Sequence, residues 1–447
     1  MAENPRDLAY QIIHRVDFQG AFLNLLIRSS LEKSKLPERD RGLVTELCYG
    51  VARLRNRVDF AIAHFSSRPL DQIDPALLDL LRLGVFQLLE TRVSAHAAVN
   101  ETVNLAQKYT NPGAAKMANA VLRACANSPE SIPWPGREDM VQYLSVVLSY
   151  SEWMAAYLIR NYGEKTAERI CAAGNDRAPL CMRINTLKGS REELEEWLSS
   201  QSIAFRRSSY VPDGLANIDA PVGKLKPLLR DGRGIFQDES SMLVPYMLGP
   251  RKGQLIMDAC AAPGGKATHL AQLTEDQARI LAVDLSRERL KAMGASMKRL
   301  GVKSVKSRQG DSTKLASVAG QQADAILVDA PCSGLGTLRR RPELKWRREE
   351  GDLAELAALQ SRLLEGAAPV LANGGLLVYS ACTITREETV EVVDAFLASH
   401  PDFQAERAVE HCPLGCPADA EVGDYLQLMT HLHNTDGMFI ARLRKSG

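Results

Sequence analysis

The sequence predicts three successive parts of different architecture: an all-helical N-terminal domain, a small mixed α/β module and a C-terminal α/β domain built on a mostly parallel sheet. The chain has 447 residues, which is enough for about three domains of roughly 150 residues each. Helical periodicity dominates the first 126 residues, where alternating β-branched residues are scarce. From residue 234 onward, short apolar runs alternate with helical stretches, which is typical of a doubly wound sheet.

The helical domain, expected over residues 1–126, repeats apolar residues at the spacing of one helix face. Asp74 precedes Pro75 and a strongly apolar segment, which indicates an N-cap followed by proline at the first helical position. The apolar positions that recur at intervals of four are Leu43, Leu47 and Val51, and then Leu77, Leu81 and Val85.

A change of composition separates this domain from the remainder of the chain. Three prolines fall between Asn127 and Gly136, so we expect a linker over residues 127–144. A strand-like run at 180–184 and a helical stretch at 191–198 then predict a small α/β module over residues 145–233.

The C-terminal domain, expected over residues 234–447, contains four short apolar runs. A short run of this kind is typical of a parallel strand that is buried on both faces. A helical stretch at 287–300 follows the second run, as the alternation of strands and helices requires. The four runs are residues 255–257, 280–283, 325–328 and 376–379.

Composition and charge exclude several classes of protein. Hydrophobic residues make up 45% of the chain and charged residues 24%, which excludes a largely disordered or collagen-like chain. The 55 basic and 54 acidic side chains leave a net charge of +1. Any binding of nucleic acid must therefore come from local basic patches and not from the charge of the whole chain.

We expect a cytoplasmic protein without a metal site. No apolar run reaches the length of about 18 residues that a membrane helix needs, and the N-terminal segment lacks the apolar core of a secretory signal. The nine cysteines are an odd number at irregular spacing, which indicates reduced thiols. His411, Cys412 and Cys416 suggest a metal site, to which His431 and His433 could add ligands. Zinc needs four ligands at fixed geometry, and Pro413 and Pro417 indicate a loose connector instead.

Acidic residues follow strand after strand in the C-terminal domain. Asp258, Asp284 and Asp329 come directly after predicted strands, and Asp311 follows a weaker apolar run. The carboxyl ends of parallel strands form the ligand crevice of such a sheet. Four carboxylates at this edge would be unfavourable unless a ligand donates hydrogen bonds to them.

A turn rich in small residues follows the first of these strands. The P-loop pattern and the dinucleotide pattern G-x-G-x-x-G both fail here, but an acid about 20–26 residues onward, Asp284, suits the two hydroxyls of a ribose. S-adenosylmethionine carries a ribose and a cationic sulfonium, which both suit an acidic crevice, so the pattern favours this cofactor. The alternative is a purely structural turn with aspartates that cap helices. The turn consists of Cys260, Ala261, Ala262, Pro263, Gly264, Gly265 and Lys266.

Two cysteines follow later strands at the same edge. Cys332 lies in the segment after Asp329, and Cys382 follows the run at 376–379. The spacing of Thr385 and Glu388 predicts a capping box, which would place Cys382 near a helix N-terminus that favours a thiolate.

A thiolate at this position suits one specific reaction. Carbon 5 of a pyrimidine becomes nucleophilic once a thiolate adds to carbon 6, so that it attacks a methyl sulfonium. Asp329 would hold N3 and the exocyclic amine of a cytosine, and Cys332 is a candidate for assisting release of the product. The alternative for both cysteines is a buried thiol that fills space.

Segments that carry these residues resemble the motifs of RNA cytosine-C5 methyltransferases. The matching segments are DACAAPGGKATHL, VDL, GD, DAPCSGLGTLRRRPELKW and YSACTI, together with MRINT, GIFQDESSMLV and DGMFIARL. The N-terminus is similar to a NusB-like RNA-binding domain through RGLVTELCYGVAR, LRLGVFQLLE, HAAVNETVNLA and NAVLR. The resemblance spans nearly the whole chain. It departs at Ala267, Ala381 and Thr383, where the family usually has threonine, threonine and serine.

The resemblance implies methylation of carbon 5 of a cytosine in small-subunit ribosomal RNA, with S-adenosylmethionine as cofactor. It implies Cys382 as nucleophile, Cys332 as the cysteine that aids release and Asp329 as a residue of the reaction. It also implies cofactor contacts from Cys260 through Lys266 and from Asp284, Asp311 and Asp329. The implied domains are NusB-like, RRM-like and Rossmann-like, and we expect a monomer.

A basic cluster lies shortly after Cys332, and its position next to the crevice favours contacts with RNA phosphates. A solvated charged surface is the alternative for this cluster. A methyltransferase acting on transfer RNA, or a binding module led by the helical domain, are the competing functions. The cluster consists of Arg339, Arg340, Arg341, Lys345, Trp346, Arg347 and Arg348.

Overall fold

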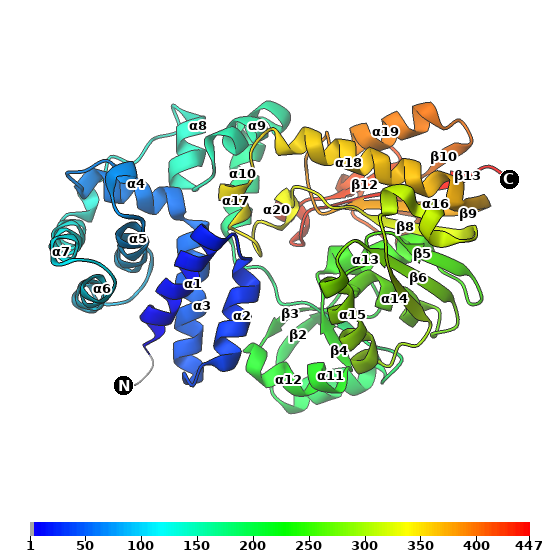
Figure 1. Cartoon of the computed structure of the whole chain (residues 1–447), viewed down its shortest axis with the longest axis horizontal. Coiled ribbons are helices and arrows are strands. Elements are labelled where there is room, and N and C mark those ends of the chain that lie inside the picture. The colour runs from blue at the N-terminus through cyan, green and yellow to red at the C-terminus, as the bar shows by residue number, and fades with distance from the viewer. Residues whose placement is uncertain (1–3) are drawn as a thin grey trace. The chain divides into compact units, whose positions relative to one another are not determined.

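Residues 4–447 are described by a computed structural model, drawn in Figure 1. The chain forms two units with separate hydrophobic cores. The first unit runs to Arg177 and also contains the later segment Leu338–Glu350, and the second comprises Ala178–Thr337 and Gly351–Gly447. The segment Leu338–Glu350 is called the inserted segment below.

The first unit is built of helices and connecting loops in its described residues, and its part before residue 127 is all-helical, as predicted. Helix α5 (Pro75–Glu90) begins as expected, because Asp74 accepts hydrogen bonds from the backbone N–H groups of Ala76 and Leu77. Ten residues of α5 are buried, which identifies it as a central helix of this core. The other helices are α1 (Pro5–Gln19), α2 (Leu23–Lys33), α3 (Glu38–Arg53), α4 (Arg55–Phe65), α6 (Ala95–Tyr109), α7 (Pro112–Asn127), α8 (Met140–Gln142), α9 (Glu152–Tyr162), α10 (Glu164–Asn175) and α17 (Leu344–Arg347).

The segment expected to be a linker packs against this helical core. Trp134 contacts the core, and the guanidinium of Arg57 lies 4.4 Å from the centre of its ring. Helices α9 and α10 also belong to the first unit, although we expected the α/β module to begin at residue 145. The change of unit lies at Arg177, because α9 and α10 pack against each other and α9 packs against the residues that precede it.

A four-stranded antiparallel sheet opens the second unit. Its strands follow the order β2-β3-β1-β4, with two helices packed on the sheet. Ser190 and Glu193 form a reciprocal capping box at the start of α11, because serine at the N-cap and glutamate three residues later favour this pair of hydrogen bonds. The elements are β1 (Met182–Ile184), α11 (Arg191–Ser200), β2 (Ala204–Arg207), β3 (Gly214–Asp219), α12 (Val222–Asp231) and β4 (Gly234–Phe236).

A nine-stranded sheet forms the remainder of the second unit. Five strands run parallel in the order β7-β6-β5-β8-β9, and all four predicted apolar runs lie within them. They are β5 (Leu255–Asp258), β6 (Arg279–Asp284), β7 (Val305–Gln309), β8 (Ala323–Asp329) and β9 (Leu371–Ala381). The antiparallel strands β10 (Phe403–Glu406), β11 (Glu421–Val422), β12 (Tyr425–Leu428) and β13 (Met438–Lys445) extend the β9 side.

The chain passes from β5 to β6 and β7 and then returns to the other side of β5 with β8. The strand order therefore reverses between β5 and β8, which is where ligands bind in sheets of this class. Separate clusters of buried side chains lie along the sheet. The helices of this part are α13 (Glu239–Leu248), α14 (Gly265–Leu273), α15 (Arg287–Leu300), α16 (Leu315–Ala319), α18 (Asp352–Ala367), α19 (Val390–Ser399) and α20 (Thr430–His433).

One expectation about the cysteines is wrong. Cys412 and Cys416 form a disulfide, because the turn between them brings their Cα atoms to 5.8 Å, within the range that a disulfide spans. Within residues 4–447, no group of three or more His, Cys, Asp or Glu side chains is arranged to hold a metal ion. Among these residues, no helix has the length and apolar composition that a membrane span requires.

Candidate active site at the carboxyl edge of the sheet

The parallel sheet brings the predicted acidic residues to one edge. Asp284 ends β6 and is buried, and its carboxylate accepts hydrogen bonds from the backbone N–H of Ala262 at 3.1 Å and of Ser286 at 2.9 Å. Asp311 follows β7, where hydrogen bonds from the Thr313 hydroxyl and N–H lower the pKa of its carboxyl. Asp284 thus connects the predicted cofactor turn to the next strand.

The glycine turn connects β5 to α14. Gly264 has a φ of +97°, and a Cβ there would lie 2.6 Å from the Met293 side chain. Only glycine fits this position without strain, because the left-handed conformation and the close packing both exclude a side chain. The turn is also fixed by hydrogen bonds from the N–H of Ala261 to Val283 and from the guanidinium of Arg289 to Ala262.

Asp258 is an unusual carboxyl at the end of β5. It is 1% exposed, and neither of its carboxylate oxygens has a hydrogen-bond partner among the described residues. Burial, reinforced by the negative charge of Asp329, raises the pKa of Asp258 to about 7. A buried acceptor without a donor is costly, so this position fits a ligand that brings hydrogen-bond donors and positive charge.

These observations fit S-adenosylmethionine, which carries ribose hydroxyls, an ammonium group and a sulfonium. The turn leaves no room for a side chain at Gly264, and aspartates end three strands of the parallel sheet, namely β5, β6 and β8. Lys266 partly offsets this charge, because its ammonium donates to the carboxylate of Asp329 at 2.6 Å. Asp329 also accepts a hydrogen bond from the Ser380 hydroxyl at 2.8 Å.

The two predicted cysteines lie in direct contact. The Sγ atoms of Cys332 and Cys382 are 3.2 Å apart, although 50 residues separate them in the sequence. Their thiol–thiol hydrogen bond, together with burial, raises the pKa of Cys332 well above its usual value. Either thiol can donate in this bond, so the contact couples the protonation of the two cysteines.

The expected capping box after Cys382 is wrong. Helix α19 begins only at Val390, and Thr385 donates its hydroxyl to the carboxylate of Glu388 at 2.7 Å instead of accepting from a backbone N–H. The helix dipole therefore gives no reason for a thiolate at Cys382, because that dipole acts within about one turn of the helix end.

Glu388 is a site residue that the sequence analysis missed. It is completely buried and accepts hydrogen bonds from the Ser333 N–H at 2.7 Å, from Gln360 at 3.1 Å and from Thr385. Ser333 follows Cys332, so this carboxylate bonds the two loops that carry the cysteines to each other. The signal in the sequence was a glutamate six residues after Cys382, but its pattern with Thr385 favoured a local cap.

Replacing Glu388 with glutamine is expected to lower the free energy of unfolding by about 1–3 kcal/mol, because the amide turns an N–H group toward a buried donor. Methylation should fall as well, since both cysteine loops lose their shared anchor. Chemical denaturation and single-turnover assays check this. Glu391→Gln is the control, because its exposed ion pair with Arg386 contributes little. Equal stability of the two variants would contradict the anchoring role.

The basic cluster is placed differently from the expectation. Lys345 is fully buried, and its ammonium donates to the side-chain oxygen of Asn175 at 2.6 Å and to the carbonyl oxygens of Arg53 and Ser149. Burial lowers the pKa of Lys345 well below its usual value. The expected phosphate contact is therefore wrong for Lys345, whose donors are used inside the first unit.

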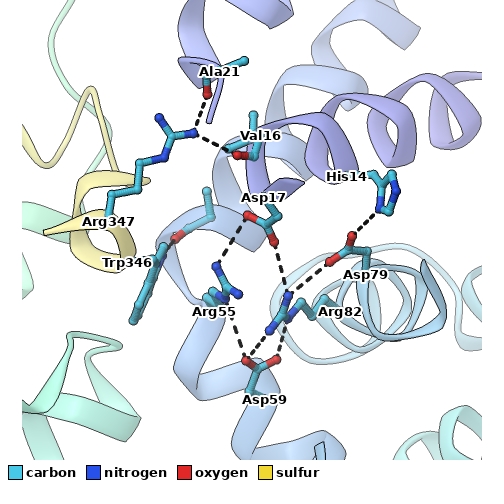
Figure 2. A network of polar contacts seen from close by, with 11 residues as sticks. His14, Val16, Asp17, Ala21, Arg55, Asp59, Asp79, Arg82, Trp346 and Arg347 are labelled. Atoms are coloured by element: carbon cyan, nitrogen blue, oxygen red, sulfur yellow. Dashed lines mark hydrogen bonds and ion pairs between the residues drawn. The ribbon is translucent and has the colours of Figure 1, made fainter. Parts of the chain in front are cut away.

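The neighbouring residues of the inserted segment have similar roles. Figure 2 shows Trp346 donating its indole N–H to a backbone carbonyl, which is that of Ala52 at 2.6 Å, and Arg347 donating to Val16 and Ala21. Arg339 is only 4% exposed, whereas Arg341 is exposed. Arg339, Lys345 and Arg347, half of the basic residues of the segment, are thus buried or bonded inside the first unit.

An ion-pair network lies close to this segment in the first unit (Figure 2). Arg82 forms a two-pronged pair with Asp59 at 2.7 and 2.8 Å and also reaches Asp17 and Asp79. Arg55 pairs with Asp17, and its guanidinium lies 5.9 Å from the centre of the Trp346 ring. The charges in this network are paired, so they do not form a basic patch.

Comparison with known proteins gives matches along nearly the whole chain. Residues 245–444 match the family described as 16S rRNA methyltransferase RsmB/F, residues 3–127 match the NusB family, and residues 150–222 match an RsmF/B-like ferredoxin-like domain. The chain is 33% identical to the probable ribosomal RNA small subunit methyltransferase B of Bacillus subtilis (strain 168), over 99% of both chains. It is 35% identical to the ribosomal RNA small subunit methyltransferase B of Citrobacter koseri, again over 99% of both.

Two solved structures from Pyrococcus horikoshii share the architecture. A methyltransferase homolog protein is 32% identical, with a TM-score of 0.59 over 68% of this chain and 98% of that one. NSun6 with bound SFG, an analogue of S-adenosylmethionine, is 27% identical, with a TM-score of 0.59 over 65% of this chain and 97% of that one.

Proposed function

Because the chain belongs to the family of ribosomal RNA small subunit methyltransferase B, whose members depend on S-adenosylmethionine, we propose that it methylates carbon 5 of a cytosine in small-subunit ribosomal RNA. The reaction proceeds through a covalent bond between Cys382 and carbon 6 of the base. The observation that carries this proposal is the contact of 3.2 Å between the Sγ atoms of Cys332 and Cys382, beside Asp329 at the edge of the sheet.

Cys382 acts as the nucleophile. Its thiolate adds to carbon 6 of the cytosine, and carbon 5 then gains the electron density that it lacks in the aromatic base. S-adenosylmethionine supplies an electrophilic methyl group when it is bound. Asp329 is held by Lys266 and Ser380. As a carboxylic acid it donates a hydrogen bond to N3 of the cytosine and accepts one from the exocyclic amine. Uracil, with a hydrogen on N3 and a carbonyl in place of the amine, does not make this pair.

Cys332 completes the reaction. After the methyl group is attached, a base must remove the proton of carbon 5 so that the bond between Cys382 and carbon 6 breaks. The Sγ of Cys332 lies 3.2 Å from that of Cys382, and therefore next to that bond. To act as this base, the Cys332 thiol first gives its own proton to water, and the resulting thiolate takes the proton of carbon 5. The electrons of that C–H bond re-form the double bond between carbons 5 and 6, and the Cys382 thiolate leaves.

The proposed cofactor residues are the turn from Cys260 through Lys266, with Asp284, Asp311 and Asp329. Asp284 is assigned to the ribose hydroxyls, and we assign the donor-poor carboxyl of Asp258 to the same crevice. In the basic cluster, Arg341 is the exposed side chain that we assign to RNA phosphates. The base must leave its stack to reach the two cysteines, so an unpaired or extruded nucleotide is the substrate.

Replacing Asp284 with alanine is expected to weaken the binding of S-adenosylmethionine by about 1–3 kcal/mol, because a charged acceptor of hydrogen bonds is lost. Titration calorimetry on the full chain measures this. Glu288→Ala is the matched control, since Glu288 is an exposed acid four residues away. Unchanged affinity of the Asp284 variant would remove this residue from the cofactor site.

The product tests the proposed reaction. The purified chain is incubated with S-adenosylmethionine and, in separate reactions, protein-free small-subunit ribosomal RNA or transfer RNA, and each RNA is digested to nucleosides for mass spectrometry. We expect 5-methylcytidine as the methylated nucleoside. Methylation of another base or of the ribose would contradict the proposed chemistry, and methylation of transfer RNA alone would contradict the proposed substrate.

A further inference from the structure

Arg183 is a completely buried arginine that reaches the helix behind the cofactor turn. It lies in β1 of the four-stranded sheet and is 1% exposed. One terminal nitrogen donates to the backbone carbonyl of Gly265 at 2.6 Å, and the other donates to the Thr268 hydroxyl at 3.0 Å. Both acceptors belong to the first turn of α14, and Gly265 is itself part of the turn assigned to the cofactor.

A second residue of the same small sheet holds the following turn of α14. Asp213, which directly precedes β3, is buried and accepts hydrogen bonds from His269 at 2.9 Å and from Gln272. Burial, together with the charge of Arg183, lowers the pKa of His269 to about 4, so the imidazole is neutral and donates this bond. The small sheet therefore contacts α14 through polar side chains at two successive turns.

The energetics do not explain Arg183 as a stabilising residue. Burial of a guanidinium is costly unless its hydrogen bonds compensate, and its Nε has no hydrogen-bond partner among the described residues. Burial also lowers its pKa to about 10. In addition, a cation at the first turn of a helix opposes the helix dipole. The advantage of an arginine here must therefore lie in the groups that it holds in position, and not in the stability of the fold.

The acceptors of Arg183 identify what it holds. Besides Gly265 and Thr268, it donates to the side-chain oxygen of Gln237 at 2.6 Å. Gln237 in turn donates to Ser241 near the start of α13. The planar guanidinium is suited to this task, because it directs several donors at fixed angles, whereas a lysine ammonium acts as a flexible point charge.

We propose that Arg183 is a positioning residue that fixes the cofactor turn and thereby sets the affinity for S-adenosylmethionine. The small α/β module then helps to position the cofactor site, in addition to any contact that it makes with RNA. This inference rests on the proposed assignment of the turn Cys260–Lys266 to the cofactor. Arg183 does not contact the reacting atoms, so its effect passes through the backbone of Gly265.

The test uses the full chain with Arg183→Met, which keeps the length of the side chain but removes its donors. The KM for S-adenosylmethionine should rise by about tenfold or more, because small displacements of a positioned site have effects of this size. The KM for RNA should stay within about twofold, well below the change that a displaced site produces. Arg183→Lys keeps the positive charge but loses the planar set of donors of the guanidinium. It should also raise the KM for S-adenosylmethionine selectively, to a smaller extent. It also serves if the methionine variant fails to fold.

Asn185→Ala is the matched structural control. Asn185 lies two residues further along, is 3% exposed, and donates to the carbonyls of Gly232 and Leu300, away from the cofactor turn. We expect it to lower the melting temperature without raising the KM for S-adenosylmethionine. An equal rise of KM in this control, or unchanged KM in both Arg183 variants, would overturn the inference.

The Asp284→Ala variant separates this inference from the proposed function. If Asp284→Ala weakens cofactor binding while both Arg183 variants bind normally, the positioning role is wrong and the cofactor site stands. If Asp284→Ala binds normally while the Arg183 variants show the selective rise in KM, the positioning role stands and the assignment of Asp284 to the ribose is wrong.

Discussion

Replacement of Cys382 by alanine is expected to lower the methylation rate by roughly 10⁴-fold or more, as the loss of a catalytic nucleophile does. Without a thiolate at carbon 6, carbon 5 of cytosine has no route to nucleophilic character. Transfer of a labelled methyl group to RNA under single-turnover conditions measures the rate. The binding of S-adenosylmethionine should be nearly unchanged, because the proposed cofactor contacts lie on other loops.

Cys181→Ala provides the control for this result. Cys181 is a buried cysteine of the second unit that lies outside the proposed site. Its replacement should cost some stability, through the loss of packing, and leave the rate of methyl transfer in the folded fraction near that of the unmodified chain. Normal turnover of Cys382→Ala would exclude this cysteine as the nucleophile.

Replacement of Cys332 by alanine is expected to have a different effect, the accumulation of a covalent complex with RNA. Cys382 still adds to carbon 6 and the methyl group still transfers, but removal of the proton from carbon 5 is slowed. Enzyme and RNA should then migrate together on a denaturing gel. The complex should require S-adenosylmethionine if the trapped base is already methylated.

The double variant Cys332→Ala/Cys382→Ala is the control, and it should form no complex. The alternative of two thiols that only fill space predicts a modest loss of stability for each variant and no adduct. If the adduct formed with Cys382→Ala instead of Cys332→Ala, the two roles would be reversed. The contact of 3.2 Å between the sulfur atoms makes either cysteine accessible to the same base, so the experiment is needed to separate them.

The parallel strands were predictable because each is buried and therefore reads as a short apolar run. Residues 280–283, for example, lie within β6 (Arg279–Asp284), and the acid that ends this strand reaches the cofactor turn as expected. The weaker run before Asp311 corresponds to β7, an edge strand with exposed side chains. The antiparallel strands beyond β9 carry no such signal, and they were not predicted.

The role of Glu388 was not predictable from local pattern alone. Its spacing from Thr385 matches a capping box, but its main backbone partner is the N–H of Ser333, 55 residues earlier in the chain. A buried carboxylate takes the strongest donors that the tertiary structure brings to it. The local pattern therefore gave the right pair of residues and the wrong interaction.

The basic cluster shows the same limit over a longer distance. Lys345 bonds to Asn175 and Arg53, which lie 170 and 292 residues away. A run of basic residues next to a proposed active site favours phosphate contacts, and nothing in its spacing reveals that the segment folds into the helical unit. Burial of a charge depends on distant partners, which a single sequence does not identify.

Bisulfite sequencing of ribosomal RNA tests the central claim most directly, because it reports 5-methylcytosine at single-nucleotide resolution. RNA is compared from cells that carry the gene, from a deletion strain, and from that strain complemented with either the unmodified chain or Cys382→Ala. The account predicts one protected cytosine in the small-subunit RNA that disappears on deletion and returns only with the unmodified chain. Its persistence after deletion, or its return with Cys382→Ala, would contradict the account.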